Sequence, residues 1–186
     1  MDERARKRRL FVGIELAPET RTRCAAVAED VRRTGLIAKY EAPEKLHVTL
    51  AFLGFVEPAR FDAVVGSLAA GRHIEPLRVS LDKLGAFPHE RRPRIAYVGA
   101  RKQGPAFQLL ARRVRSAYAE LGFEFRDDPV AHVTIARIKE SKRPLPLVEF
   151  APIALEIREL SLFESFPDPA NKTSRYEIVA RAPLSR

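Results

Sequence analysis

The sequence has a single cysteine and no tryptophan among its 186 residues. With Cys24 alone, neither an intramolecular disulfide nor a metal cluster of cysteine thiolates can form. No apolar run approaches the roughly 18 residues of a membrane-spanning helix. The basic start at Arg4–Arg9 precedes an apolar stretch that Glu15 and Pro18 interrupt early, so no signal peptide is predicted. These absences predict a cytoplasmic protein that does not enter a membrane.

The chain also lacks a glycine-rich phosphate-binding loop and heptad repeats. It has four histidines and no second cluster of metal ligands, so neither a metal ion nor another cofactor is expected. Positive charge is abundant: 33 Lys and Arg against 24 Asp and Glu give a formal net charge of +9. This charge favours a polyanionic partner such as nucleic acid, although a basic surface without such a partner would have the same composition.

The remaining composition is that of a soluble globular protein, with 46% hydrophobic and 31% charged residues. The length suits one domain or two small, closely packed lobes. We expect a single two-lobed domain over residues 1–186 that acts as a monomer, with residues 1–8 as a frayed, charged leader. Cys24 falls at helical spacing with Val27, Ala28 and Val31, which predicts a small core residue rather than a reactive thiol.

A short stretch of sequence occurs twice. His47-Val48-Thr49-Leu50 and His132-Val133-Thr134-Ile135 both read His-Val-Thr-aliphatic, both precede Ala, and the two histidines are 85 residues apart. In a strand the His and Thr of each copy share one face. An imidazole beside a hydroxyl, presented twice, is what acid–base chemistry on a phosphate needs. One copy would be a weak signal, but two copies at nearly half-chain spacing predict duplicated halves that bring both motifs to one cleft.

Hydrophobic periodicity and turn residues predict the secondary structure. Helices are expected over residues 18–33, 57–70 and 105–121, and strands over residues 10–16, 45–53, 77–87, 95–98, 131–138, 153–163 and 175–180. Gly54 is expected to end its strand, and residues 164–174 are expected to be irregular. Strands joined both by helices and by a hairpin indicate an α+β fold. Phe11, in the first strand, faces either the cleft or the core.

The two motifs resemble the double signature of the 2H phosphoesterase superfamily, which is named for its two His-x-Thr/Ser motifs. Within that superfamily the chain resembles the bacterial and archaeal RNA 2′,3′-cyclic phosphodiesterases, also called 2′–5′ RNA ligases. The likeness covers most of the chain, in residues 9–16, 46–54, 93–99, 131–137, 160–165 and 174–181. It implies two lobes of mostly antiparallel sheet related by a pseudo-twofold axis, with helices outside and the active-site cleft between the lobes.

The resemblance also implies a reaction: hydrolysis of an RNA 2′,3′-cyclic phosphodiester end to a 2′-phosphomonoester, with the bond to O3′ broken. Carried over by motif, His47 and His132 are the catalytic pair, and Thr49 and Thr134 bind the phosphate. We assign His47 as the acid toward O3′ and His132 as the base toward water. The motifs are so alike that the reverse assignment stays open.

The family often has an arginine after the second motif, which Arg137 matches. Strict alternation puts Arg137 on the face opposite His132, so it reaches the cleft only if the strand twists or ends there. Relatives commonly carry proline directly before the second histidine, whereas this chain has Ala131 there and Pro129 two residues before Ala131. This departure predicts a different local approach of the strand.

Three other functions fit parts of the sequence. 2′–5′ RNA ligation would use the same residues, although water in excess favours hydrolysis. A non-catalytic RNA-binding module would not need two imidazoles. A small cyclic nucleotide could replace the end of an RNA, for example of a tRNA fragment, as substrate. Arg91, Arg92 and Arg94 in the turn at residues 88–94 either contact RNA phosphates or form a solvated charged turn.

Overall fold

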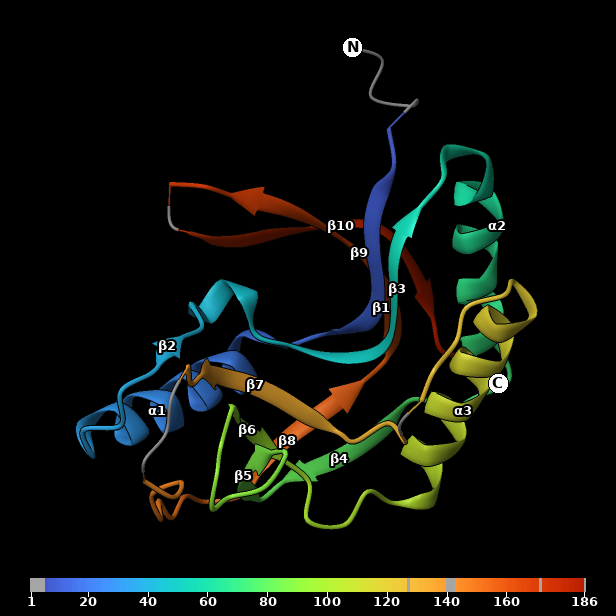
Figure 1. The fold of residues 1–186 in the computed structure, drawn as a ribbon. Helices are drawn as coiled ribbons and strands as arrows, with labels where there is room; N and C mark the ends of the chain where they lie inside the picture. Colours follow the sequence, from blue (N-terminus) through green and yellow to red (C-terminus); the bar gives the residue numbers. More distant parts are fainter. Residues whose placement is uncertain (1–5, 127, 140–142, 171, 186) are drawn as a thin grey trace.

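A computed structural model describes residues 6–126, 128–139, 143–170 and 172–185. Its helices and strands are β1 (Arg8–Glu15), α1 (Pro18–Arg33), β2 (Lys39–Tyr40), β3 (His47–Val56), α2 (Phe61–Gly66), β4 (Leu77–Leu81), β5 (Lys83–Phe87), β6 (Ile95–Gly99), α3 (Pro105–Glu120), β7 (His132–Arg137), β8 (Ile153–Ile157), β9 (Glu159–Asp168) and β10 (Thr173–Pro183) (Figure 1). Short 3-10 helices occupy Pro43–Lys45, Pro58–Arg60 and Ser67–Gly71. The expected α+β class is confirmed.

One large antiparallel sheet carries both halves of the molecule. Its strand order is β10-β9-β1-β3-β7-β6-β5, and β2 pairs with the free part of β7. The first half of the sheet contains β10, β9, β1 and β3, and the second contains β7, β6, β5 and β2. In the described part of the chain, the strand ladder between the two halves consists of one residue pair, Val48 with Val133, where β3 meets β7.

The halves repeat the same local topology. In each, a strand leads through a 16-residue helix to a motif strand that pairs antiparallel with the first strand: β1, α1 and β3, then β6, α3 and β7. Each helix packs on the motif strand of the other half, α1 on β7 and α3 on β3. Val48 and Val133 hold equivalent places in the two motifs, so the approximate twofold axis passes through their contact.

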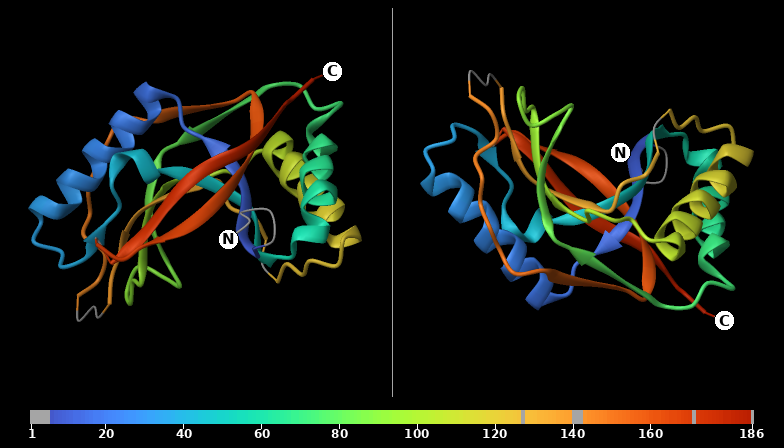
Figure 2. Two further views of the ribbon diagram at one scale, coloured as in Figure 1. Left: turned by 90° about the horizontal axis from the view of Figure 1, so that it is seen from above. Right: turned by 90° about the horizontal axis from the view of Figure 1, so that it is seen from below.

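The helices lie outside the sheet, α1 on one side and α2 with α3 on the opposite side (Figure 2). Their apolar stripes supply the core, with Cys24 and Val31 from α1 and Leu110, Val114 and Tyr118 from α3 fully buried. Burial raises the pKa of the Cys24 thiol to about 12, so this residue is a core residue as predicted. The Tyr118 hydroxyl donates to the Val64 carbonyl at 2.9 Å, which satisfies its buried polar atom.

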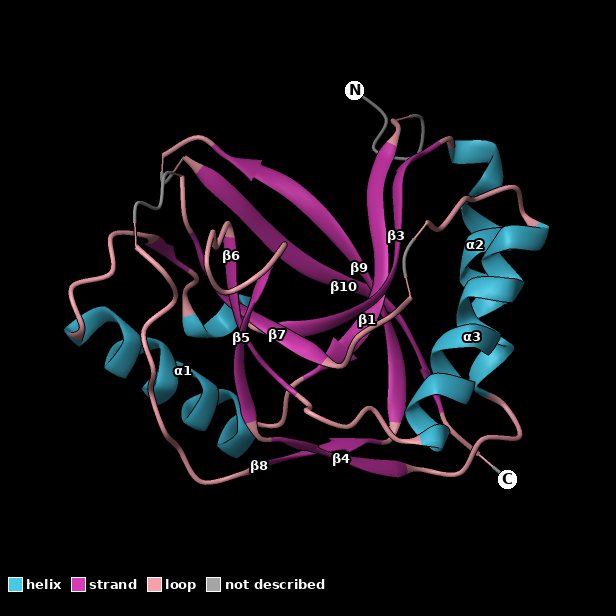
Figure 3. Ribbon diagram, turned by 60° about the horizontal axis from the view of Figure 1, so that its bottom comes forward, coloured by secondary structure: helices cyan, strands magenta, loops and turns pink. Residues whose placement is uncertain are grey.

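A separate two-stranded sheet spans the two halves. β4 pairs antiparallel with β8 from Leu77–Ile157 to Leu81–Ile153, apart from the large sheet. β8 contacts α1 and β4 contacts α3, so this ribbon connects the two outer helices below the large sheet (Figure 3). Because both halves share one sheet, this ribbon and a continuous core, we propose that residues 1–186 fold as a single domain.

Two long strands predicted from alternation are each divided between sheets. Residues 77–87 form β4 and β5, and residues 153–163 form β8 and the start of β9. Asp82 marks the first break, where its backbone N–H donates to Gly99 and its carboxylate accepts from the Arg101 N–H at 2.8 Å. Arg158 marks the second, where its carbonyl accepts from Leu184. The apolar alternation changes phase at both breaks, because Leu84 follows Leu81 and Leu160 follows Ile157 at a spacing of three residues. The prediction of single strands overlooked these changes of phase.

Two further expectations are wrong. Residues 164–174 are not irregular, because β9 continues to Asp168 and β10 begins at Thr173, and the two strands form a hairpin. Gly54 does not end β3. The register moves from Leu10–Gly54 to Phe11–Phe52, so Leu53 is an extra residue in a bulge, and Gly54 takes a positive φ of 70° within the strand.

The first strand begins earlier in the chain than expected. A frayed leader was predicted through residue 8, whereas β1 begins at Arg8. The Glu164 side chain is 1% exposed and pairs with both Arg6 and Arg8, with Arg8 Nε at 2.8 Å. The expectation for residues 1–5 lies outside the described residues. No helix in the described part of the chain has the length and apolar character that crossing a bilayer requires.

A methyl group at Gly13 should disturb the centre of this sheet. A Cβ built there would overlap the carbonyl oxygen of Val48, whose backbone cannot move without shifting the first motif. We expect Gly13→Ala to lower the free energy of unfolding by about 1–3 kcal/mol, the usual cost of overpacking, as measured by urea denaturation.

The matched control is Gly66→Ala in α2, where an added Cβ meets nothing within 4 Å. Alanine is the better helix former there, so this variant should be neutral or more stable. Equal stability of the two variants would contradict the assigned close approach of β1 and β3.

Candidate active site

The antiparallel contact of Val48 with Val133 places the two motifs side by side in opposite directions. It follows that His47 lies across from Thr134, and Thr49 lies across from His132. All four side chains are partly exposed on the same face and line one cavity of about 390 Å³. Each imidazole therefore neighbours its own threonine along the strand and the other motif's threonine across it.

Both histidines are fixed in the same way through Nδ1. The His47 Nδ1 lies 2.6 Å from the Lys45 carbonyl oxygen, and the His132 Nδ1 lies 2.8 Å from the Val130 carbonyl oxygen. A carbonyl only accepts, so the neutral imidazoles carry their proton on Nδ1 and leave Nε2 as a base. The Thr49 hydroxyl lies 3.1 Å from the His47 Nε2, to which it can donate.

Aromatic rings from neighbouring strands of the sheet support each histidine. The His47 ring lies 4.8 Å from Phe11 in β1 and 5.5 Å from Phe163 in β9, centre to centre. Tyr176 in β10 meets the same ring edge-on at 5.2 Å. Phe11 was expected to face either the cleft or the core, and it does both. It is 3% exposed, and its ring lies at the base of the cavity beside His47.

The second histidine has the equivalent support, with Tyr97 in β6 at 5.3 Å and Phe87 in β5 at 5.1 Å. Two glycines make room for the Tyr97 ring. A Cβ built at Gly85 would lie 2.5 Å from that ring, and one at Gly99 would lie 2.8 Å from it. No local sequence pattern indicates these aromatic floors, because their residues belong to different strands.

Burial lowers the pKa of both imidazoles below the ordinary value of 6.5. The backbone carbonyl at Nδ1 opposes this effect in each case. His47 has further charged neighbours: Glu41 raises its pKa, whereas His132 and Arg137 lower it. Both rings are therefore mainly neutral at pH 7 in the free protein, and charge on either one has to be stabilised by an anion in the cavity.

Arg137 does line the cavity, and a β-bulge is the reason. In the β6–β7 pair, Tyr97 faces Thr134 and Ala96 faces Ala136, so Ile135 is an extra residue. The bulge reverses the alternation after Ile135 and returns Arg137 to the face of His132. The strict alternation that placed it on the opposite face is thus wrong for this strand.

Glu41 holds the Arg137 side chain. Its carboxylate is 12% exposed and accepts from the Arg137 Nε at 2.8 Å, which leaves the two terminal nitrogens of the guanidinium for another partner. The Glu41 backbone N–H also donates to the Ile135 carbonyl at 2.9 Å, so the same residue fixes the bulge. The sequence provided no signal for Glu41, which lies six residues before the first motif, directly after β2.

The first motif strand contains the equivalent bulge. Val12 faces Ala51 and Gly13 faces Thr49, so Leu50 is the extra residue, and the Arg115 Nε donates to the Leu50 carbonyl at 2.9 Å. This bulge turns Phe52 into the cavity, at the position that corresponds to Arg137 in the second motif.

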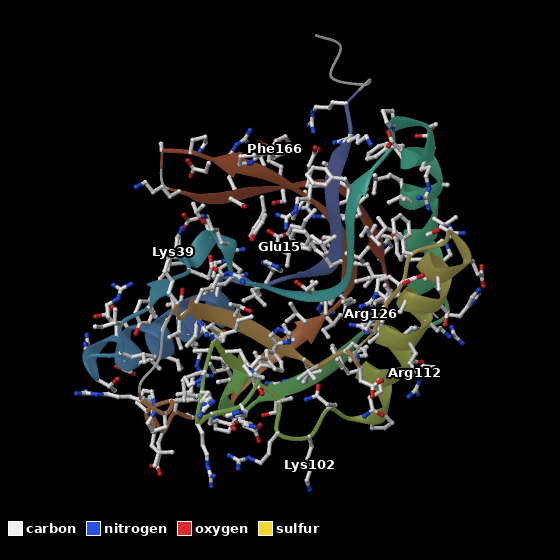
Figure 4. All side chains as sticks on the ribbon, viewed as in Figure 1. Glu15, Lys39, Lys102, Arg112, Arg126 and Phe166 are labelled. Carbon is white, nitrogen blue, oxygen red and sulfur yellow. The ribbon has the colours of Figure 1, made fainter. Side chains whose placement is uncertain are left out.

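Lysines and the β9–β10 hairpin complete the cavity wall. Lys45 donates from Nζ to the Thr173 hydroxyl at 3.0 Å, and Lys39 donates to the Lys172 carbonyl. The other two histidines, His73 and His89, are exposed, and the described cavity lining does not include the turn residues Arg91, Arg92 or Arg94. Arg112 and Arg126 also lie away from it, on the α3 side of the molecule (Figure 4). Among the described residues, no group of three or more His, Cys, Asp or Glu is placed to hold a metal ion.

Comparison with known proteins gives consistent matches. The family model described as LigT-like phosphoesterase matches the chain twice in succession, over residues 14–97 and 98–171, so each match contains one motif. A protein of Archaeoglobus fulgidus named RNA 2′,3′-cyclic phosphodiesterase is 30% identical over 131 residues, covering 70% of this chain and 73% of the relative. One of Geobacillus stearothermophilus with the same name is 29% identical over 94% of this chain, which spans 56% of that relative.

Solved structures share the fold over nearly the whole chain. A protein of Thermus thermophilus superposes with a TM-score of 0.80 and 27% identity, covering 95% of this chain and 97% of that one. The structure of Escherichia coli LigT in complex with 3′-AMP gives a TM-score of 0.75 and 27% identity, with 97% and 99% of the two chains covered. The expected arrangement of mostly antiparallel sheet with helices outside is therefore confirmed.

Imidazole NMR should detect both lowered pKa values. We expect both rings of the cavity to titrate below 6.5, with their resonances assigned by His47→Gln and His132→Gln. Between each lowered pKa and 6.5 the unfolded chain binds more protons, so these groups should make the free energy of unfolding increase with pH there. This contribution is lost as the pH falls from 6.5 through the folded-state pKa. A ring that titrates above 6.5 in the free protein would contradict the assigned burial.

Proposed function

Because the chain belongs to the LigT-like phosphoesterase family, we propose that it hydrolyses the 2′,3′-cyclic phosphodiester end of RNA to a 2′-phosphomonoester. The names of its relatives support 2′,3′-cyclic phosphodiesterase activity. The single observation that carries the proposal for this chain is geometric. Two imidazoles, each fixed through Nδ1 by a backbone carbonyl, share one cavity with the two motif threonines.

In the proposed reaction, a phosphate lies between the two Nε2 atoms. Water attacks phosphorus opposite O3′, His132 takes the proton of the water, and His47 gives a proton to O3′ as the P–O3′ bond breaks. The new P–O bond to water replaces the bond to O3′, and the proton count of the protein is unchanged. The Thr49 and Thr134 hydroxyls and the terminal nitrogens of Arg137 bind the non-bridging oxygens, on which charge accumulates in the transition state.

The environment of the cavity determines the protonation states of His47 and His132. One imidazole has to be charged before reaction, although burial favours the neutral form of both. The monoanionic phosphodiester stabilises that charge once it binds. Of the two, only His47 has Glu41 as a neighbour that raises its pKa, which supports His47 as the acid. The reverse assignment would give the same products, and the pH profiles below separate the two.

These groups supply every proton transfer and phosphate contact in the proposed reaction, so we propose that it proceeds without a metal ion or cofactor. We also propose that the enzyme acts as a monomer, since one chain supplies both motifs. A cytoplasmic location stays a prediction that rests on the lone cysteine and the RNA substrate. 2′–5′ ligation would use the same side chains with a ribose hydroxyl in place of water.

The proposal is tested with a short RNA that ends in a 2′,3′-cyclic phosphate, in the presence of EDTA. We expect turnover to a 2′-phosphate, and we expect His47→Ala and His132→Ala each to reduce kcat by about 100- to 10,000-fold, the usual contribution of a general acid or base. Chromatography against 2′- and 3′-phosphate standards identifies the product.

His73→Ala is the matched control, because that histidine is exposed in a loop outside the cavity lining. It should retain wild-type activity and thermal stability. Full activity in either motif variant would refute the two-histidine mechanism. Salt-sensitive RNA binding without turnover by the wild-type protein would instead indicate an RNA-binding module.

Arg137 and Glu41 should affect catalysis differently. We expect Arg137→Gln to lower kcat/KM about 10- to 100-fold, as expected for the loss of a charge-assisted hydrogen bond to phosphate. Glu41→Gln keeps an oxygen that can accept from Arg137 but removes the charge that raises the pKa of His47. The limb of the kcat/KM profile that reports His47 should therefore move to lower pH.

The control for this pair is Arg92→Gln, in the exposed turn outside the described cavity lining, which should behave as wild type. With His47 as the acid, Glu41→Gln should move the limb that reports the acid and leave the limb of the base in place. If His47 is the base instead, the limb of the base should move. An unchanged pH profile would show that Glu41 does not act on either imidazole.

A further inference from the structure

Phe55 is an exposed aromatic side chain beside the active-site cavity. It lies in β3 directly opposite Arg9 in β1, and cross-strand partners project from the same face of a sheet. Arg9 lines the cavity, so Phe55 shares the cavity face. The Phe55 side chain is 70% exposed. Single exposed apolar residues are common on protein surfaces. The proposal therefore rests on the position of Phe55 beside the cavity and not on its exposure.

Arg9 connects Phe55 to the cavity. Its guanidinium carbon lies 4.9 Å from the ring centre of Phe52, and its Nη1 donates to the Ser165 hydroxyl at 3.2 Å. These contacts hold the Arg9 guanidinium at the cavity wall beside Phe52, one strand away from Phe55. Its remaining N–H groups can donate to an anion, and a phosphodiester suits the planar guanidinium.

Arg9 and Phe55 are spaced to meet the part of an RNA substrate that extends out of the cavity. A terminal nucleotide in the cavity continues through its 5′ oxygen and a phosphodiester to the preceding nucleotide. That neighbour has to lie outside a cavity of about 390 Å³, which is the size of a site for one small ligand. Phe52 and Phe55 face Phe11 and Arg9, which are two residues apart in β1, because the bulge at Leu53 takes up one residue of β3. The two phenylalanines are therefore about 7 Å apart along the strand, a distance that one nucleotide linkage can cover.

We propose that Arg9 and Phe55 form a second nucleotide subsite. Arg9 binds the phosphodiester 5′ to the terminal nucleotide, and Phe55 stacks on the base of the preceding one. The subsite makes an oligonucleotide end a better substrate than a cyclic mononucleotide. A phenyl ring stacks on any base, so the subsite favours length rather than sequence. The proposal rests on the proposed function, because it extends the same substrate beyond the cavity.

The test compares kcat/KM on three substrates: adenosine 2′,3′-cyclic phosphate, the dinucleotide ApA with a 2′,3′-cyclic end, and that dinucleotide with an abasic 5′ residue. Wild type should prefer the intact dinucleotide. Phe55→Ala should lower kcat/KM on it by about 5- to 100-fold, the range for loss of one stacked base. The same variant should not change kcat/KM on the other two substrates, which have no base to stack at the second subsite.

Two variants separate stacking from general damage. Phe55→Trp should retain the preference for the intact dinucleotide, because it keeps an aromatic face. Leu147→Ala is the matched control, since Leu147 is fully exposed outside the described cavity lining, and it should leave all three values unchanged.

Arg9→Gln should lower kcat/KM on both dinucleotides, because the abasic one keeps the phosphodiester.

Three outcomes would overturn the subsite: no preference of wild type for the intact dinucleotide, equal losses in Phe55→Ala on all three substrates, or a monomer–dimer change in Phe55→Ala with unchanged kinetics. The last would assign Phe55 to contact with a second copy. If wild type turns over none of the substrates, the proposed function fails instead. In that case, calorimetry gives the dissociation constants of the intact and the abasic dinucleotide products, each with a 2′-phosphate. Tighter binding of the intact product by wild type, lost in Phe55→Ala, would support the subsite, and equal binding would overturn it.

Discussion

The antiparallel contact between β3 and β7 is the constraint on which the cavity depends. Among the described residues, Val48 and Val133 form the one ladder pair between the two halves of the large sheet, and each follows a motif histidine directly. Any other register would separate the motifs or turn one of them toward the core. The crossed packing of the helices supports this register, because α1 covers the second motif strand and α3 covers the first. The catalytic geometry is thus a property of both halves together.

Two β-bulges make the symmetric halves of the sheet present different side chains to the cavity. The extra residues Leu50 and Ile135 each turn the residue two positions later into the cavity, which is Phe52 in one half and Arg137 in the other. A side chain fixes the first bulge, through Arg115, and a backbone N–H fixes the second, through Glu41. The duplicated scaffold therefore presents one aromatic and one cationic group at equivalent places, and the cavity lining is asymmetric there.

Much of the fold was predictable, because its helices and hairpins are local. Proline at the first turn and glycine after the last defined α1 over Pro18–Arg33 and α3 over Pro105–Glu120, close to the residues expected. The strands were less predictable. Alternation reports which face a side chain takes but not which strand is its neighbour, so β4 and β5 read as one strand although they belong to different sheets.

The sequence by itself determined which chemical groups the two motifs carry: two His-Val-Thr copies, each with imidazole and hydroxyl on one face of a strand, in a strongly basic chain. These follow from residue type and from the two-residue period of a strand, which are local properties. Only the tertiary structure decided that Arg137 reaches the cavity, that Glu41 holds it, and which rings lie under each histidine. Those contacts depend on bulges and on strand neighbours distant in the chain, and a local pattern does not encode which strands pair.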